Sequence, residues 1–375
     1  MMKIIISGGG TGGHIFPALS IANAFKEQFH DVEILFVGAE GRMEMEKVPQ
    51  AGYKIIGLPI IGLPRKLSLK MLKFVFNYFK SKKIGLKIVK DFKPDFVIGV
   101  GGYASFPSLN AAAKLGIPYF IQEQNSYSGK SNNKLAKKAT KIFVAYNNME
   151  RFFPADKIIK TGNPIRKDIL NLDDKRAEAY KFFNLSPEKK TILVLGGSLG
   201  AKNINQCVSE NINLILENDF QLVWQTGKNY LATAQQSLSG ISNPLIPVNV
   251  RVQDFIYEMN LAYSLADIII SRSGASSISE LCIVGKPTVL VPSPNVAEDH
   301  QTKNTKVLVD VDAAIMIKDD QTYEKLIPET INLLKDAQKC NRLSLNIKKL
   351  GLPNATNTIV TEILKIILIP TIQSE

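Results

Sequence analysis

Short hydrophobic runs alternate along the chain with longer segments in which apolar and polar positions recur at helical spacing. The runs are nearly continuous in Ile, Val, Leu and Phe, which is typical of strands buried on both faces of a parallel sheet. Six lie in the first half, at 3–7, 33–37, 54–58, 95–100, 117–121 and 141–145. Six lie in the second half, at 191–195, 221–225, 248–253, 266–271, 287–292 and 313–317. The pattern predicts an α/β protein.

The alternation restarts near the middle of the chain. Runs 3–7 and 191–195 each lead into a glycine-rich loop and then a helical segment. The length of 375 residues suits two domains, and the turn Gly162-Asn163-Pro164 interrupts the pattern between them. We therefore expect two doubly wound domains, with one cleft between them because ligands of such sheets bind beyond the carboxyl ends of the strands. The amphipathic segment 356–367 would pack back on either domain.

Composition narrows the class of protein. Hydrophobic residues make up 45% and charged residues 21%, which excludes wholesale disorder. The net charge of +12 favours an anionic partner, whether nucleic acid, a phosphorylated ligand or an acidic membrane. Cys207, Cys282 and Cys340 are far apart, which argues against a disulfide framework or a zinc site. No run is suited to a signal peptide or a spanning helix, so we expect a soluble protein that could rest on a membrane.

The first glycine loop, 8–14, can be interpreted either as a ligand-binding loop or as a plain turn. Gly8, Gly10 and Gly13 satisfy the GxGxxG pattern of dinucleotide sites. The acidic residue expected after the second strand is poorly placed, since Glu33 opens that strand and Glu40 lies late. In either case, five glycines in seven residues bring backbone N–H groups and a helix N-terminus close to an anion or a sugar. The alternative is a plain tight turn.

Two loops in the second half of the chain can likewise be interpreted as ligand-binding loops or as helix caps. Ser198 in the loop 196–201 would donate to a phosphate, cap the following helix, or do both. In the segment 273–280, Glu280 would accept hydrogen bonds from the hydroxyls of a ribose. The alternative there is a capping box between Ser277 and Glu280, which needs no ligand.

Histidines and acidic pairs offer few further candidates. His14 directly follows the first glycine loop and is a general-base candidate, although a capping or packing role fits as well. His30 lies in a polar turn, and His300 is expected to line a loop. The segment 310–312 matches a DxD pattern, but a three-residue match in a predicted turn is not enough to predict a metal site.

The segment 60–83 interleaves apolar side chains with lysines and arginine. Its apolar positions include Leu72, Val75 and Phe79, and its basic positions include Lys73 and Lys80. One interpretation is a core helix with a basic solvent face. The other is a surface that docks on an anionic bilayer, which we favour because it also accounts for the positive net charge.

Taken together, the segments resemble the MurG family of bacterial GT-B glycosyltransferases. The resemblance covers essentially the whole chain, and no single motif is specific by itself. Seven motifs occur in the family's order: GGGTGGHIFPAL at 8–19, GVGGYASFPS at 99–108, EQNSYSGKSN at 123–132, TGNPIR at 161–166, GGSLGA at 196–201, SRSGASSISE at 271–280 and DHQTKN at 299–304.

The resemblance implies a GT-B fold of two Rossmann-like domains. Residues 1–162 would form the acceptor and membrane-facing domain, 163–355 would bind the UDP-sugar, and the helix in 356–375 would pack on the N-terminal domain. The implied reaction is inverting transfer of N-acetylglucosamine from UDP-N-acetylglucosamine to the 4-hydroxyl of the muramyl sugar of lipid I, which gives lipid II in peptidoglycan synthesis. The implied location is peripheral, on the cytoplasmic face of the bacterial cell membrane, whose anionic surface is an expected partner.

Roles for individual residues follow from the resemblance alone. Residues implied to approach the sugar and diphosphate are Thr11, Gly12, Gly13 and Asn125. Arg166 and Ser198 would contact the donor from two other loops. Residues implied to hold uridine, ribose and the sugar hydroxyls are Ile256, Ala275, Ser276, Ser277, Ile278, Ser279, Glu280 and Gln301. His14, Tyr103 and Glu123 would line the acceptor side, with His14 as the base and Glu123 as the second candidate.

Two positions depart from the family pattern. Leu199 stands where Gln is common, so one polar contact is expected to be absent, and Thr305 stands where Ala is usual. No metal and no cofactor are expected, so loop N–H groups, helix N-termini, Ser198 and Arg166 would stabilise the leaving diphosphate. The remaining alternatives are an NAD-linked Rossmann oxidoreductase and a non-catalytic sugar-nucleotide binder. A nucleic-acid-binding module is disfavoured, because the lysines cluster beside apolar residues.

Overall fold

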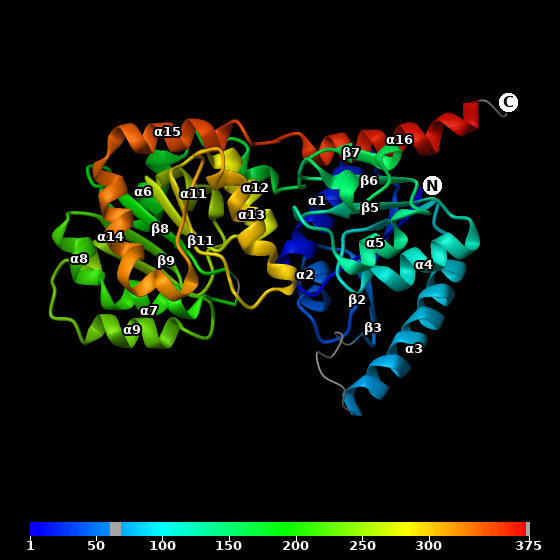
Figure 1. Cartoon of the computed structure of the whole chain (residues 1–375), viewed down its shortest axis with the longest axis horizontal. Helices are drawn as coiled ribbons and strands as arrows, with labels where there is room; N and C mark the ends of the chain where they lie inside the picture. The colour runs from blue at the N-terminus through cyan, green and yellow to red at the C-terminus, as the bar shows by residue number, and fades with distance from the viewer. Residues whose placement is uncertain (61–68, 198, 373–375) are drawn as a thin grey trace. The chain divides into compact units, whose positions relative to one another are not determined.

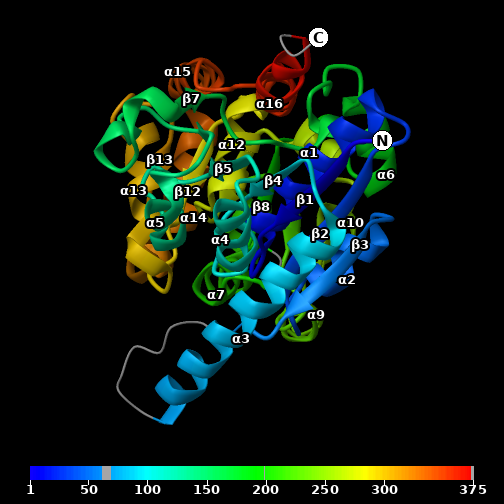
Figure 2. The same ribbon diagram turned by 90° about the vertical axis from the view of Figure 1, so that its right-hand side faces the viewer.

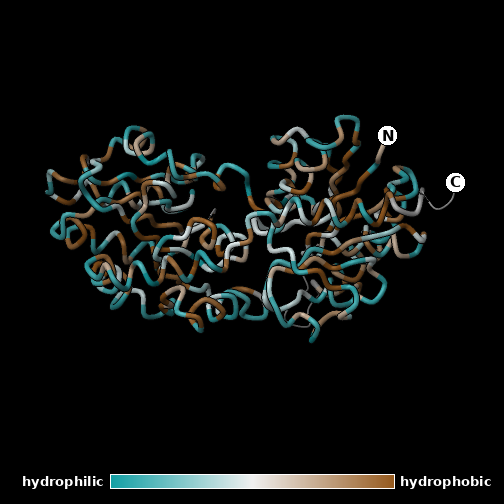
Figure 3. Tube along the Cα trace, turned by 90° about the horizontal axis from the view of Figure 1, so that it is seen from above, coloured by the Kyte–Doolittle hydropathy of each residue, from teal (hydrophilic) through white to brown (hydrophobic). Residues whose placement is uncertain are grey.

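The computed structural model describes residues 1–60, 69–197 and 199–372. It divides into two compact units (Figure 1). Unit 1 comprises Met1–Arg166 and Pro353–Glu375, and unit 2 comprises Lys167–Leu352. In each unit the hydrophobic stretches of the chain run through the interior, and most hydrophilic stretches lie towards the outside (Figure 3).

Unit 1 is built on a parallel sheet. Its strands are β1 (Lys3–Ser7), β2 (Glu33–Ala39), β3 (Lys54–Leu58), β4 (Phe96–Gly99), β5 (Tyr119–Glu123), β6 (Lys141–Val144) and β7 (Ile158–Lys160). They lie in the order β3-β2-β1-β4-β5-β6-β7, and every pairing is parallel. The direction of the order reverses between β1 and β4, which is the point where open α/β sheets bind ligands.

Helices cover both faces of this sheet, because successive side chains of a strand point to opposite faces. Ile4 and Ile6 of β1 pack with α1 (Gly12–Gln28), α2 (Glu44–Gln50) and α16 (Ala355–Ile372). Ile5 packs with α3 (Leu69–Phe92), α4 (Ser105–Leu115) and α5 (Lys130–Ala136). The terminal helix α16 contributes Ile359 and Ile363 to the first of these cores.

Unit 2 repeats the same topology. Its strands are β8 (Thr191–Leu195), β9 (Gln221–Gln225), β10 (Val250–Gln253), β11 (Ile268–Ser271), β12 (Thr288–Leu290) and β13 (Ile315–Met316). They pair in parallel in the order β10-β9-β8-β11-β12-β13, so the reversal falls between β8 and β11.

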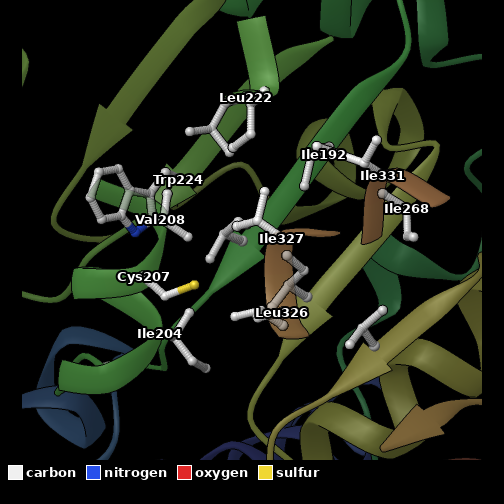
Figure 4. Packing of buried hydrophobic residues seen from close by; sticks show 14 of the residues in the cluster. Ile192, Ile204, Cys207, Val208, Leu222, Trp224, Ile268, Leu326, Ile327 and Ile331 are labelled. Carbon is white, nitrogen blue, oxygen red and sulfur yellow. The ribbon is translucent and has the colours of Figure 1, made fainter. Parts of the chain in front are cut away.

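One face of the second sheet is covered by a large hydrophobic core. The helices that contribute to it are α7 (Lys202–Glu210), α8 (Ile212–Glu217), α9 (Leu231–Ser239), α14 (Thr322–Lys335) and α15 (Ala337–Lys348). Trp224 of β9 lies beside Cys207 and Val208 of α7 (Figure 4). The indole Nε1–H of Trp224 donates to Asn205 Oδ1 at 3.0 Å, so the one polar atom of the ring has a partner in the core. The remaining α-helices of unit 2 are α6 (Arg176–Phe183), α10 (Ile246–Asn249), α11 (Met259–Leu265), α12 (Ala275–Val284) and α13 (His300–Val309).

The predicted α/β fold with two parallel sheets is confirmed, and each of the twelve predicted runs overlaps a strand. Strand β2 continues to Ala39, beyond the predicted end at residue 37, and two further details differ. The edge strand β7 was not predicted, because its three residues are at most half-buried and offer no long hydrophobic run. Strand β5 continues to Glu123, beyond the predicted end at residue 121. Polar Gln122 and Glu123 end the hydrophobic run there, yet both are buried because other polar groups bond to them.

Candidate active site

Two glycine loops meet where the sheet order of unit 1 reverses. Gly101 and Gly102 follow β4 with φ of +96° and +76°, a region that favours glycine. A Cβ on Gly102 would lie 2.5 Å from the Gly9 carbonyl oxygen, and one on Gly8 would lie 2.3 Å from Val100 Cγ2. The loops after β1 and β4 are therefore packed backbone against backbone, which no larger residue would permit.

His14 lies at this junction, in the first turn of α1. A Cβ on Gly101 would be 2.9 Å from the imidazole Nε2, so the ring rests directly on the second glycine loop. Its Nδ1 is 3.3 Å from Oγ1 of Thr11, the N-cap residue of α1. If Nδ1 carries the proton, it donates to Thr11 and Nε2 is the proton-accepting nitrogen, whereas in the other tautomer the Thr11 hydroxyl donates to Nδ1. Thr11, Gly12, Gly13 and His14 thus lie together, and Tyr103, 47% exposed, follows the neighbouring loop.

A buried carboxylate occupies the first glycine loop. Both oxygens of Glu44 accept from the Gly10 N–H, at 3.1 and 3.0 Å, and Oε1 also accepts from the Ala39 N–H at 2.9 Å. Gly10 is the middle glycine of the GxGxxG match, so a nucleotide phosphate at this amide would face the negative charge of Glu44. The geometry weighs against the dinucleotide interpretation of the loop.

Glu123 is a second buried carboxylate in unit 1. Its Oε1 accepts from the backbone N–H and the side-chain amide of Asn125, at 3.1 and 3.3 Å. Its Oε2 accepts from the Gly129 N–H at 3.0 Å and from Asn132 Nδ2 at 2.8 Å. A carboxylate with four donors is poorly suited to take a proton from an acceptor substrate, because protonation would displace one of these bonds. Its evident role is to hold the loop that carries Asn125.

Amides tie the chain around Arg166 to the same region. Asn163 donates from Nδ2 to the Gln124 carbonyl oxygen at 3.0 Å and accepts from Gln122 Nε2 at 2.9 Å. The Arg166 guanidinium lies 5.5 Å from the ring centroid of Phe16 on α1. Asn125 and Arg166 are therefore held at the carboxyl end of the first sheet, as are Thr11 and His14.

In unit 2 the glycine loop 196–201 follows β8. Ser198 lies outside the described residues, so its phosphate-binding and capping roles stay predictions. Leu199 is exposed, and Gly200 (φ +79°) is packed so closely that a Cβ would lie 2.3 Å from the Thr226 carbonyl oxygen. The loop is thus fixed against the end of β9.

Helix α12 begins where β11 ends and contains six of the predicted residues. Its N-cap is Gly274, so Ser277 and Glu280 lie inside the helix and the capping-box alternative is wrong. Glu280 instead accepts from the Tyr263 hydroxyl at 2.9 Å. The side chain of Ile278 is buried, while Ser276, Ser277 and Ser279 are partly exposed. The Glu280 carboxylate is thus oriented by a tyrosine hydroxyl.

Glutamine side chains connect the remaining loops of unit 2. Gln301 Oε1 accepts from the Ser273 N–H at 3.2 Å and the Ser293 N–H at 2.8 Å, joining the loops after β11 and β12. Gln225 Oε1 accepts from the Ile256 N–H at 2.9 Å. Ile256 and Gln301, both predicted from the resemblance, therefore lie at the carboxyl end of the second sheet with α12.

Helix α3 accounts for the described part of the segment 60–83, since 61–68 lie outside the described residues. One face packs on α4, with the rings of Tyr78 and Phe106 5.8 Å apart. On its other side, apolar residues recur at i, i+3, i+4 and i+7 and remain exposed: Leu72 (70%), Val75 (44%), Phe76 (67%) and Phe79 (62%). We call these four residues the α3 stripe. Figure 2 shows the helix extending away from the body of unit 1 at its N-terminal end.

Neither a spanning helix nor a metal cluster occurs in the described ranges. None of their helices is long and apolar enough to cross a membrane. Within the same ranges, no three His, Cys, Asp or Glu side chains are grouped so as to hold a metal ion.

Several residues that organise the site were not predicted. They are Glu44, Gln124, Asn163, Gln225 and Tyr263. Glu44 stands in a charged segment that resembles an exposed helix, Gln225 ends a predicted run and Gln124 follows one closely, whereas Asn163 and Tyr263 lie outside the predicted runs. A polar residue at the end of a predicted buried strand, such as Gln225, is the one signal that could have been used.

Family models match most of the chain. Residues 4–144 match the glycosyltransferase family 28 N-terminal domain, and residues 191–359 match the glycosyltransferase family 28 C-terminal domain. These two stretches contain the sheets of units 1 and 2, apart from the first residue of β1 and the edge strand β7.

Full-length relatives extend the match. A Parabacteroides distasonis protein is 54% identical over 97% of this chain and 98% of its own length, and a Flavobacterium psychrophilum protein is 53% identical over 97% and 98%. Both are named UDP-N-acetylglucosamine--N-acetylmuramyl-(pentapeptide) pyrophosphoryl-undecaprenol N-acetylglucosamine transferase. The crystal structure of Acinetobacter baumannii MurG aligns with a TM-score of 0.75 and 29% identity, covering 97% of this chain and all of that one. The chain belongs to glycosyltransferase family 28 and, within it, to the MurG family of N-acetylglucosamine transferases.

Proposed function

We propose that this protein transfers N-acetylglucosamine from UDP-N-acetylglucosamine to the 4-hydroxyl of the muramyl sugar of lipid I, with inversion, and so produces lipid II. The observation that carries the proposal is 54% identity over 97% of the chain with a relative that bears this enzyme's name. The glycine loops and strand ends described above supply polar groups suited to a sugar nucleotide.

Donor binding is assigned to residues 163–355 and acceptor binding to residues 1–162, and the cleft expected between them stays a prediction. Glu280 accepts hydrogen bonds from the ribose hydroxyls, and its bond from Tyr263 supports this role. The segment around Ile256 receives the uracil, and Gln301 and Asn125 receive the sugar hydroxyls. Ser198, Arg166 and the N-terminus of α1 stabilise the diphosphate, aided by the backbone at Thr11, Gly12 and Gly13.

His14 is the proposed general base. It removes the proton of the muramyl 4-hydroxyl while that oxygen attacks the anomeric carbon of N-acetylglucosamine. The bond between the anomeric carbon and the phosphate oxygen breaks, and UDP leaves with the electron pair. The contact between Nδ1 of His14 and Thr11 Oγ1 supports this assignment, since in the tautomer with the proton on Nδ1 it leaves Nε2 to accept the proton. Tyr103 lines the acceptor side, and Glu123 holds Asn125 in place.

A partner surface is proposed for the α3 stripe. Its exposed apolar side chains and the neighbouring exposed Lys73, Lys80 and Lys83 suit an anionic bilayer, at about 1 kcal/mol per basic residue. This would hold the enzyme peripherally on the cytoplasmic face of the bacterial cell membrane. Replacing Phe76 and Phe79 by Glu should abolish cosedimentation with phosphatidylglycerol vesicles, whereas Leu345→Glu at an exposed apolar site of unit 2 should not.

Radiolabel transfer tests the reaction itself. The full chain is incubated with labelled UDP-N-acetylglucosamine and a lipid I analogue, with and without EDTA. We expect label in the lipid product under both conditions, because amide dipoles and Arg166 are proposed to stabilise the diphosphate. Absence of transfer would refute the proposed function, and transfer that is lost only in EDTA would refute the metal-free charge stabilisation.

A further inference from the structure

Glu44 is a buried charged residue that the proposed chemistry does not yet use. It is 1% exposed and is the first residue of the short helix α2. Its carboxylate accepts three contacts from two amides, those of Gly10 in the first glycine loop and Ala39 at the end of β2. Burying a carboxylate destabilises the folded protein unless the carboxylate is hydrogen-bonded. The Gly10 and Ala39 amides therefore hold Glu44 in place, and Glu44 in turn holds the two loops that carry these amides.

Two glycines, Gly9 and Gly38, leave the space that the Glu44 side chain fills. A Cβ on Gly9 would lie 2.0 Å from Glu44 Oε1, and a Cβ on Gly38 would lie 2.6 Å from Glu44 Cγ. Any larger residue at either position would displace the carboxylate. Two strand-end loops therefore accommodate Glu44, whereas Glu46, two residues later on the same helix, is exposed to solvent.

The loop that Glu44 holds continues directly into the proposed catalytic residues. Gly10 precedes Thr11, and Thr11 Oγ1 contacts His14 Nδ1 at 3.3 Å. The adjacent Gly9 carbonyl is packed on Gly102, so a shift of this loop would also move the surface on which His14 rests. A displacement of about 1 Å at such a point costs roughly 10²-fold in rate.

We propose that Glu44 is a positioning residue for transfer, a built-in anion that holds the first glycine loop and thereby fixes Thr11 and His14. The proposal rests on the proposed function. It also assigns the Gly10 N–H to the protein itself, so this amide does not serve the donor diphosphate. Most donor contacts are assigned to unit 2, and only those of Thr11, Gly12 and Gly13 lie beside this loop, so donor binding should depend on Glu44 less than transfer does.

Chemical rescue provides the test. Glu44→Ala should lower kcat for the lipid I analogue by about 10²-fold, while the Kd of UDP-N-acetylglucosamine from calorimetry rises by a much smaller factor. Sodium formate or acetate should restore much of kcat by entering the vacated site, and sodium chloride at equal ionic strength should not. Glu46→Ala, on the same helix, should match the parent chain throughout. Glu44→Gln keeps one acceptor oxygen and should retain intermediate activity, which keeps the test possible if the alanine variant does not fold.

Hydrogen exchange separates this proposal from the proposed function. Peptides covering 8–16 should exchange faster in Glu44→Ala and recover protection in formate, whatever the activity of the chain. An unchanged kcat in a folded Glu44→Ala variant would overturn the proposal, as would equal losses of kcat and donor affinity that formate does not restore. If the parent chain transfers no label, the proposed function fails, and unchanged exchange in the variant would then overturn the role of Glu44 as well.

Discussion

The two units hold their ligand-facing loops with different chemistry. In unit 1 the loops after β1 and β5 are tied to the buried carboxylates of Glu44 and Glu123. In unit 2, Gln225 accepts from a backbone N–H group after β10, and Gln301 accepts from backbone N–H groups after β11 and β12. Arg272 also donates to the carbonyl oxygens of Val291 and Pro292 after β12. The first six strands of unit 1 and the six strands of unit 2 follow the same order, so the difference does not come from topology.

The difference agrees with the roles proposed for the units. Hydrogen bonds to carboxylates are roughly twice as strong as bonds between neutral groups, so they suit loops that must be held rigidly. They also bring negative charge, which would stabilise the positive charge that His14 acquires as a base. Gln225 and Gln301 hold their loops in unit 2 without adding negative charge near the proposed uridine, ribose and sugar contacts.

The largest effect is expected at His14. His14→Ala should lower kcat by about 10²- to 10⁴-fold, because it removes the proposed proton acceptor from unit 1. The Kd of UDP-N-acetylglucosamine, measured by calorimetry, should change much less. Unchanged turnover would show that His14 is not the base. The buried carboxylates of unit 1 would then have no catalytic base to stabilise.

Glu123→Ala should be nearly as damaging, since it leaves four donors without their acceptor. We expect a loss of roughly 10²-fold in kcat and a lower melting temperature, since each bond to a charged group contributes about 1.5–3 kcal/mol. Glu123→Gln, which keeps one acceptor oxygen, should lie between the alanine variant and the parent chain in both measurements. If the alanine variant keeps full activity, the carboxylate does not position Asn125.

Gln301→Glu places a carboxylate in unit 2 at a position where a neutral amide now holds the loops, as Glu44 and Glu123 hold loops in unit 1. The new carboxylate can still accept from the Ser273 and Ser293 N–H groups, so the loops should keep their geometry. Its charge should weaken UDP-N-acetylglucosamine binding by about 10-fold or more, and added salt should reduce the loss. If the variant and the parent chain bind the donor equally well at low salt, a neutral side chain at position 301 is not needed for donor binding.

The smallest effect concerns the neutral core of unit 2. Burial raises the pKa of the Cys282 thiol from its ordinary value of 9.0 to about 12, and that of Cys207 to about 11. A raised pKa in the folded state means that the stabilisation is complete below pH 9 and is lost as pH rises towards 12. The free energy of unfolding should therefore fall above pH 9, less steeply in Cys282→Ala, by up to about 1.4 kcal/mol per pH unit. Identical slopes in the two proteins would contradict this prediction.

The sequence alone determined the fold class of this protein. Hydrophobic runs such as 3–7 and 191–195 are long, rich in Ile, Leu and Val, and followed by glycine loops, so local periodicity and turn chemistry agree. The site residues themselves were predicted from the family resemblance, and most of them lie at the carboxyl ends of strands, which parallel topology brings to one edge. The short edge strand β7 was missed for the opposite reason, since nothing local requires it.

The tertiary structure alone decided what the polar residues do. Glu44 and Glu46 have the same side chain two positions apart, yet one is buried in the glycine loop and the other is solvated. Glu280 fits a capping box in the sequence but lies inside α12 and bonds to Tyr263. Burial of hydrophobic residues follows from periodicity along one segment, whereas a carboxylate or amide takes its role from donors that distant segments supply.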